Sequence, residues 1–217
     1  MRLSMSKVRL VSLSLTAAFA FVVLIQAGCN NSKEVQVPSK AERIEKGRML
    51  VELGGCNDCH SPKVMTEMGP VPDTTRLLSG HPQDEPVANI DPAMLNSKMW
   101  VHSSMDATAW IGPWGVSYTA NLTPDPETGL GSWTEDLFIK ALRSGKHMGI
   151  GRPILPPMPW PGIGKASDED LKNIFAYLHS LPAIHNKVPE PITPNMMASI
   201  LSKDNSKKNV LKAENVQ

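Results

Sequence analysis

Cysteine is scarce in this chain of 217 residues, which has only Cys29, Cys56 and Cys59. A closed structural zinc site takes four ligands, and no further cysteine follows Cys59 to complete one. Aromatic residues are also few, at 5%, whereas glycine and proline are abundant, at 15 and 19 residues. We therefore expect much of the chain to be loop, around a core that is short of large rings.

An excess of charge of one sign is absent as well. The chain has 22 basic and 21 acidic residues, a formal net charge of +1. Arg2, Lys7 and Arg9 lie in an N-terminal segment without acidic residues, and removing these three leaves 19 basic against 21 acidic side chains. The sequence has no basic stripe, so we expect no nucleic-acid partner.

The stretch Cys56-Asn57-Asp58-Cys59-His60 is the most informative feature that is present. Cys-x-x-Cys-His is the attachment sequence of c-type haem. Two thiols one helical turn apart can each form a thioether with one vinyl group of a porphyrin, and the next residue, His60, can offer an imidazole nitrogen to the iron. We therefore predict one covalent haem c, whose large apolar ring would also serve as the middle of the core.

Three other interpretations of this stretch are open from the sequence. A dithiol redox site of the thioredoxin type normally opens a helix after a strand, whereas a helical pattern precedes Cys56 and no parallel-strand pattern is visible. Half of a zinc site would lack its remaining cysteines. The third is a chance match in an exported protein, and haem is the interpretation that we favour.

A second iron ligand is predicted in the stretch Pro153–Pro161, where four prolines surround Met158 within a few residues. Because proline fixes φ, such a loop holds the thioether in place beforehand and loses less entropy when the thioether binds. Methionine also fills gaps in cores, which is the structural alternative. His147 or Met148 is the alternative ligand, and an iron without a second protein ligand is the remaining possibility.

Other polar residues are weaker candidates. We expect His81 and His102 to be surface or hydrogen-bonded side chains rather than iron ligands. Asp125 and Glu127 lie in a string of turns that lacks the alternating ligands of a calcium site. Candidates for contacts to haem propionates, among which residue chemistry does not decide, are Arg143, Arg152, Trp133 and Trp160.

Residues 1–29 are typical of a bacterial secretion signal, with a basic start and an apolar run at 10–25. Small residues precede Cys29, as in lipoprotein signals whose cysteine receives the lipid and becomes the new N-terminus. An uncleaved transmembrane anchor and plain signal cleavage are the alternatives. Each of the three would export the domain, to the periplasmic side of a bacterial membrane, and lipidation of Cys29 is the one that we favour.

Capping signals and apolar stripes predict helices within the rest of the chain. The firm ones are at about 41–53, 135–144 and 168–181, with shorter ones around Ser79 and at 91–100, and an extended segment is expected at 116–122. Gly47 lies inside the first helix, where glycine costs about 1 kcal/mol relative to alanine. We therefore expect another helix to approach closely there, with Phe175 and Tyr177 as candidate contacts.

The sequence thus divides into four segments. We expect a signal at 1–29, a polar tether at 30–40, one folded domain at 41–191, and a polar, disordered tail at 192–217 with one weak helix near 195–201.

With these residues in view, the chain resembles class I c-type cytochromes with a single haem. More narrowly, it resembles the cytochrome c subunits of membrane-bound bacterial alcohol dehydrogenases. The resemblance covers about 41–191 and rests on these stretches: Cys56–His60, Thr119–Asp125, Gly131–Thr134, Pro157–Pro159, and Asp168–Leu171 running to Ala176–Leu178. Those subunits commonly carry three haem domains, whereas this chain has one motif, and its segment 61–118 is longer than a minimal cytochrome needs.

The resemblance implies an all-α, cytochrome c-like fold whose first and last helices pack crosswise around a covalent haem, with a long loop-rich insertion. It implies His60 below the iron and Met158 above it. The implied function is one-electron transfer between a periplasmic or membrane dehydrogenase and a terminal acceptor, by a protein that is not itself an enzyme. The expected partners are a redox donor, a redox acceptor and the membrane.

Two rival functions are open from the sequence. The first is a haem enzyme or ligand-binding haem protein with an open iron position, of the peroxidase-like kind. The second is an interaction lipoprotein without haem.

Overall fold

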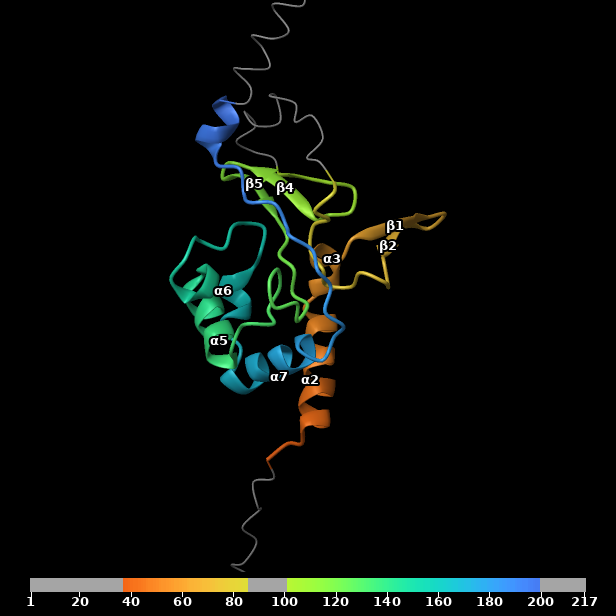
Figure 1. Ribbon diagram of the computed structural model, residues 1–217, viewed down its shortest axis with the longest axis vertical. Coiled ribbons are helices and arrows are strands. Elements are labelled where there is room, and N and C mark those ends of the chain that lie inside the picture. Colours follow the sequence, from red (N-terminus) through yellow and green to blue (C-terminus); the bar gives the residue numbers. More distant parts are fainter. Residues whose placement is uncertain (1–36, 86–100, 200–217) are drawn as a thin grey trace, which may run out of the picture. The chain divides into compact units, whose positions relative to one another are not determined.

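The computed structural model describes residues 37–85 and 101–199 (Figure 1). The predicted signal at 1–29 with Cys29, and the helix expected at 91–100, lie outside these ranges. The described helices and strands are α2 (Lys40–Leu53), α3 (Cys56–His60), β1 (Lys63–Thr66), β2 (Gly69–Pro72), β3 (His102–Ser103), β4 (Ala109–Gly112), β5 (Gly115–Tyr118), α5 (Glu135–Ser144), the 3₁₀ turn η1 (His147–Gly149), α6 (Trp160–Ile163) and α7 (Asp168–Leu178).

The three long helices begin where their caps predict. The Ser39 hydroxyl accepts from the backbone N–H of Glu42, whose carboxylate accepts from the backbone N–H of Ser39, so the predicted capping box is present at α2. Thr134 accepts from the third residue of α5, and Ser167 does the same at α7. Local hydrogen bonding therefore fixes the start of each helix.

Helices α2 and α7 cross each other, as Figure 1 shows for the upright α2 and the transverse α7. Gly47 lies at the crossing, because a Cβ atom placed on it would overlap the backbone carbonyl of Asn173 and contact the Cβ of Tyr177. The crosswise packing and the contact with Tyr177 are confirmed. Phe175 instead packs on Phe138 of α5, with ring centroids 5.5 Å apart.

The expectation of an all-α fold is wrong, because the described chain also contains two small antiparallel sheets. Strands β1 and β2 pair from Lys63 opposite Pro72 to Thr66 opposite Gly69, and β3, β4 and β5 form the second sheet in that order. Gly69 and Gly115 have φ of 107° and 96°, which suits them to tight reversals between strands. Hairpins need only local pairing and leave no helical period in the sequence.

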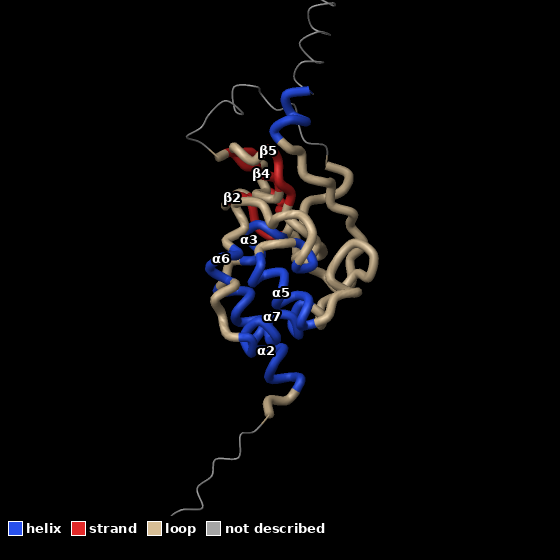
Figure 2. The backbone as a smooth tube through the Cα atoms, turned by 90° about the vertical axis from the view of Figure 1, so that its left-hand side faces the viewer, coloured by secondary structure: helices blue, strands red, loops and turns tan. Residues whose placement is uncertain are grey.

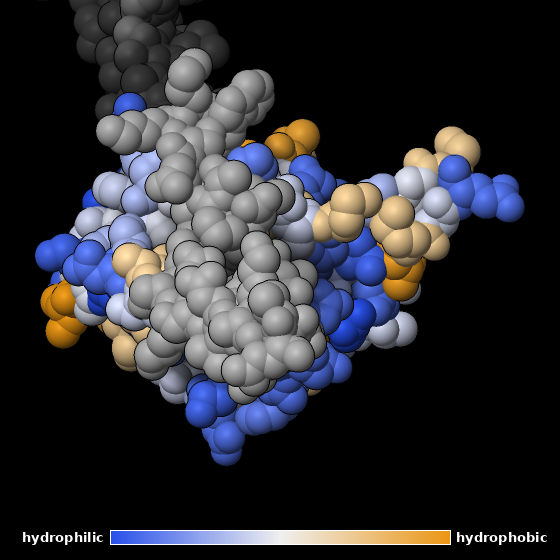
Figure 3. Space-filling model, turned by 90° about the horizontal axis from the view of Figure 1, so that it is seen from above, coloured by the Kyte–Doolittle hydropathy of each residue, from blue (hydrophilic) through white to orange (hydrophobic). Residues whose placement is uncertain are grey.

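Two details within this region also bear on the predictions. Residues around Ser79 form turns rather than the expected helix, whereas β5 confirms extended backbone at the start of 116–122. The β1–β2 hairpin projects from the domain and exposes apolar as well as polar side chains, which are seen from above in Figure 3.

Helices α2, α5, α6 and α7 and the two sheets occupy different ends of the domain, and Figure 2 shows α3 between them. One apolar cluster joins the helices, and its buried members are Val51, Leu78, Leu130, Phe138, Leu142, Leu171, Phe175 and Leu178. Leu78 comes from the loop after β2, so the cluster also holds the loops against the helices. Cys56 and Met158 both pack on this cluster from outside.

Order continues beyond residue 191. Ile192 pairs with Val116 of β5 through two backbone hydrogen bonds of 2.8 and 3.0 Å. A short helix follows at 194–199, near the weak helix predicted at 195–201, and Met197 in it is only 4% exposed. Within the expected tail, Ile192 is therefore paired with β5 and Met197 is buried, and 200–217 lie outside the described residues.

The crossing at Gly47 yields the first prediction. Gly47→Ala should lower the free energy of unfolding by about 1–3 kcal/mol, because the added methyl group forces α2 and α7 apart. Denaturant unfolding of the purified protein measures the change. Gly162→Ala on α6 is the matched control, since a Cβ at Gly162 meets no atom within 4 Å. Equal stability of the two variants would contradict close packing at Gly47.

Candidate functional site

The Cys-x-x-Cys-His residues lie on α3, a single short helix that starts directly after α2. Gly55 precedes α3 with a left-handed φ of 63°, a conformation that costs little only for glycine. Because of this turn, the chain ends α2 and begins α3 within two residues. The sequence therefore brings Cys56, Cys59 and His60 onto one helical turn, as the spacing of the motif predicts.

The two thiols are half-buried and free. Burial raises the pKa of both Cys56 and Cys59, and the nearby Asp58 carboxylate raises each further. The attacking thiol of a dithiol redox site has a lowered pKa instead. The local environment therefore keeps both sulfurs protonated and disfavours the dithiol interpretation.

His60 is buried, and its ring is fixed by one hydrogen bond. Nδ1 lies 2.8 Å from the backbone oxygen of Ala120. A carbonyl oxygen only accepts, so Nδ1 carries the proton and donates it. Burial lowers the pKa of His60, although the bond to Ala120 opposes this, so the ring is held neutral with its lone pair on Nε2. This is the tautomer and orientation of a histidine that ligates a metal.

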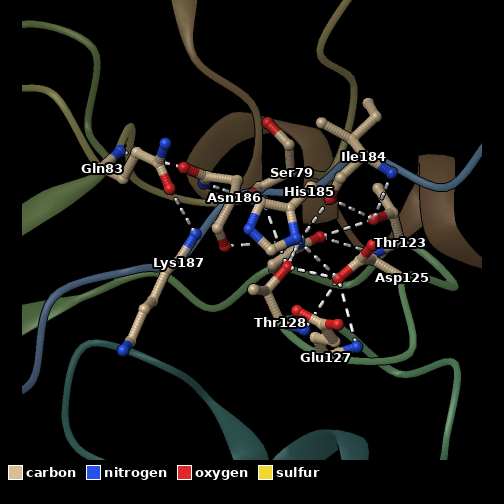
Figure 4. Close-up of polar contacts among 11 residues, drawn as sticks. Ser79, Gln83, Thr123, Asp125, Glu127, Thr128, Ile184, His185, Asn186 and Lys187 are labelled. Carbon is tan, nitrogen blue, oxygen red and sulfur yellow. Dashed lines mark hydrogen bonds and ion pairs between the residues drawn. The ribbon is translucent and has the colours of Figure 1, made fainter.

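The segment that carries Ala120 is held in place by a buried polar network (Figure 4). Asn186 donates to the backbone oxygens of Ser79 and His81, at 2.6 and 2.9 Å, and accepts from the backbone N–H of Gln83. The Asn121 side chain donates to the carbonyl of Ile184 at 2.8 Å. These bonds tie residues 79–83, 121–128 and 184–187 together around His60.

A second set of bonds connects this network to α3 itself. The backbone N–H of Gly80 donates to the carbonyl of His60 at 2.8 Å, and the backbone N–H of Leu78 donates to the hydroxyl of Ser61. Leu78 is fully buried with a φ of 59°, which is unusual for a residue with a side chain. Such strain persists only where the surroundings determine the backbone, as they do beside α3.

The loop with Met158 is anchored on β5. The Ser117 hydroxyl donates to the carbonyl of Pro156 at 2.6 Å and accepts from the indole N–H of Trp114. The peptide bond between Pro156 and Pro157 is cis. Met158 is half-buried on the same apolar cluster as Cys56, so the structure brings the loop and α3 to one core.

The alternative ligands are less well placed. His147 is exposed, with its ring edge-on to Trp133 at a centroid distance of 5.2 Å, and Met148 is 40% exposed. Neither belongs to the apolar cluster or the side chains packed on it. Met158 differs from both in packing on that cluster, and its ligation of iron stays a prediction.

Several other polar candidates are already engaged. His81 is buried, and its Nδ1 lies 2.8 Å from the Thr108 hydroxyl, which confirms that it is a hydrogen-bonded side chain. His81 also lies near the carboxylates of Glu85 and Asp106, but Asp106 accepts from Ser104 and Thr108. Arg143, a candidate propionate contact, donates to the carbonyls of Gly164 and Ala166 and to the carboxylate of Asp168.

Sequence reasoning missed the Ala120 carbonyl and the Ser117 hydroxyl. Ala120 acts through its backbone, so its residue type carries no signal. Ser117 lies in the segment expected to be extended, but nothing in the sequence points to its contact with the Met158 loop. The stretch 119–125 stands out in the sequence only through its resemblance to the cytochrome family. Its role in the polar network could not be predicted, because it depends on residues far along the chain such as Asn186.

Comparison with known proteins gives consistent relatives, although no family model matches the chain. The chain is 43% identical over 134 residues to the gluconate 2-dehydrogenase cytochrome c subunit of Pantoea cypripedii, covering 62% of this chain and 22% of that protein. It is 33% identical over 114 residues to the cytochrome c subunit of the quinone alcohol dehydrogenase of Gluconobacter oxydans, covering 48% and 24%.

A third relative is the fructose dehydrogenase cytochrome subunit of Gluconobacter japonicus. The identity is 26% over 168 residues, covering 76% of this chain and 27% of that protein. The chain thus spans about a quarter of the length of these three relatives.

The network around Asn186 yields the second prediction. Asn186→Ala should lower the free energy of unfolding by about 2–4 kcal/mol, because it leaves buried backbone groups without partners. Thermal or denaturant unfolding measures the loss. Asn195→Ala, at an exposed position of the helix at 194–199, is the control and should change stability by less than about 0.5 kcal/mol. A similarly small loss for Asn186→Ala would show that the network is not needed.

Proposed function

We propose that this chain, which resembles the cytochrome c subunits of alcohol, gluconate and fructose dehydrogenases, is a c-type cytochrome that transfers single electrons. The observation that carries the proposal is the arrangement on α3. Two protonated thiols and a neutral imidazole with its Nε2 lone pair lie on one helical turn, and Cys56 packs against the apolar core. Covalent haem attachment needs these three groups together.

The residues present fit a haem c. Cys56 and Cys59 would form the two thioether bonds, His60 would bind iron through Nε2, and Met158 would bind iron through its sulfur. When bound, the haem supplies one reversible electron step between ferric and ferrous iron. A histidine and methionine pair favours the ferrous form relative to two histidines, and so raises the reduction potential.

The residues of this chain would hold the two iron ligands in place and keep substrates from the iron, and they would carry out no chemistry of their own. The Ala120 carbonyl fixes the ring of His60, and the Ser117 hydroxyl fixes the loop of Met158. With both His60 and Met158 bound to the iron, no substrate would bind there, and little rearrangement would accompany the transfer of an electron. The chain would take one electron from a donor and pass it to an acceptor. We therefore propose that it is an electron carrier and is not itself an enzyme.

The partners are redox proteins. The relatives are named as subunits of dehydrogenases, and we propose that a dehydrogenase donates electrons to this chain and that a second redox protein accepts them. Contacts of this kind are small and transient, because the carrier must leave each partner quickly.

The fold that we propose is a cytochrome c-like domain at 41–191, in which α2 and α7 cross and the two small sheets belong to the long insertion. The crossing of α2 and α7 at Gly47 supports it. We also propose that residues 1–29 export the domain to the periplasmic side of a bacterial membrane, and that a lipid on Cys29 holds it there through the tether at 30–40. Within 37–85 and 101–199, no helix has the length and apolar character needed to cross a membrane.

Attachment of haem is tested by intact mass. Protein exported by a host that can attach haem should be heavier than its polypeptide by one haem, and Cys56→Ala with Cys59→Ala should remove this added mass. Cys29→Ala is the control, because it should remove lipid and retain haem. A wild-type product without porphyrin would refute the proposed function and favour an interaction lipoprotein.

Ligation by Met158 is tested by the visible spectrum of the oxidised protein. Wild type should be low-spin with the weak Met–Fe(III) band, and Met158→Ala should lose that band and have a lower reduction potential. Met148→Ala is the matched control and should change neither. A band that survives Met158→Ala would exclude this ligand. A high-spin wild type that binds carbon monoxide or cyanide without displacing methionine would instead indicate an open iron position.

A further inference from the structure

Lys63 is the first residue of β1, and its side chain turns back to the haem-attachment helix. Its Nζ donates to the backbone oxygens of Asn57 and Asp58, both at 3.0 Å, and of Ser61 at 2.7 Å. Three carbonyl acceptors require three N–H donors, and only the charged ammonium form of lysine has three. The contacts therefore place a positive charge against α3.

The three carbonyls lie in the second half of α3 and at Ser61, the residue directly after it. The last carbonyls of a helix have no partner within the helix and carry its partial negative charge. Asn57 and Asp58 are the two residues between the cysteines, and Ser61 follows His60 directly. A single ammonium group thus joins both sides of His60.

The position of Lys63 is partly shielded from water, so its charge is only partly screened. The side chain is half-buried, and burial lowers the pKa of Lys63, while the carboxylates of Asp106 and Asp58 oppose that shift. Asp106 comes from the loop between β3 and β4, and Asp58 from α3. The two carboxylates offset the charge of Lys63 in part. The hydrogen bonds to the turn are made by the Lys63 ammonium and by neither carboxylate.

We propose that Lys63 is a positioning residue that holds the haem-attachment turn closed and raises the reduction potential of the bound haem through its fixed charge. This inference rests on the proposed function. Oxidation of the iron by one electron adds one positive charge to the site, and a neighbouring fixed cation opposes that addition. The ferrous form is therefore favoured. Lys63 itself neither gains nor loses a proton or an electron in the step.

The test is a redox titration of the complete, exported haem protein. Lys63→Met removes the charge and keeps a side chain of similar length. At a fixed solution potential it should lower the ratio of ferrous to ferric protein on the order of threefold to tenfold, the effect of one partly screened charge. Lys63→Arg keeps the charge and should stay close to wild type. Lys46→Met, at an exposed position of α2, removes the same net charge elsewhere and is the matched control.

The outcomes separate this inference from the proposed function. A Lys63→Met potential equal to that of Lys46→Met, or an equal fall in Lys63→Arg, would overturn the role of the charge while the haem remains. If Lys63→Met does not accumulate, Lys63→Gln is measured in its place. If neither neutral variant yields haem protein and Lys63→Arg does, the role in potential is overturned in favour of a role in assembly. Absence of haem from wild type would refute the proposed function itself.

Discussion

The structure depends on one hydrogen bond, from Nδ1 of His60 to the backbone oxygen of Ala120. It decides which nitrogen of a buried ring carries the proton, and therefore which nitrogen can bind iron. A ring without that acceptor could rotate, or could present the wrong tautomer. Because a carbonyl group points in one direction only, the position of the backbone at 119–121 sets the orientation of the His60 ring.

Much of the rest of the domain serves to hold that carbonyl and the opposing loop. The chain is rich in glycine and proline, and its loops are held by side-chain hydrogen bonds more than by regular secondary structure. Asn186 links its own segment to the loops at 79–83 and 121–128, and Ser117 links β5 to the loop of Met158. Beneath them, the crossing of α2 and α7 fixes the helices, and one apolar cluster receives both Cys56 and Met158. A haem between the two loops would add the large apolar surface that the sequence lacks.

The features that could be predicted from the sequence are those set by local physics. The capping box at Ser39 fixes where α2 starts, and Gly47 indicates a close helix crossing because no larger residue fits there. The two sheets were not predicted, since short hairpins have no long apolar period. The Ala120 carbonyl and the ammonium of Lys63 were also beyond prediction, because a backbone acceptor has no residue type and a lysine reveals no partners until the chain has folded.

The central claim is that α3 and the proline-rich loop hold one iron between an imidazole nitrogen and a thioether sulfur. X-ray absorption at the iron edge of the oxidised, purified protein tests this most directly. We predict an iron with one sulfur and five nitrogen neighbours, four from the porphyrin and one from His60. A first shell without sulfur, or a purified protein without iron, would contradict the account.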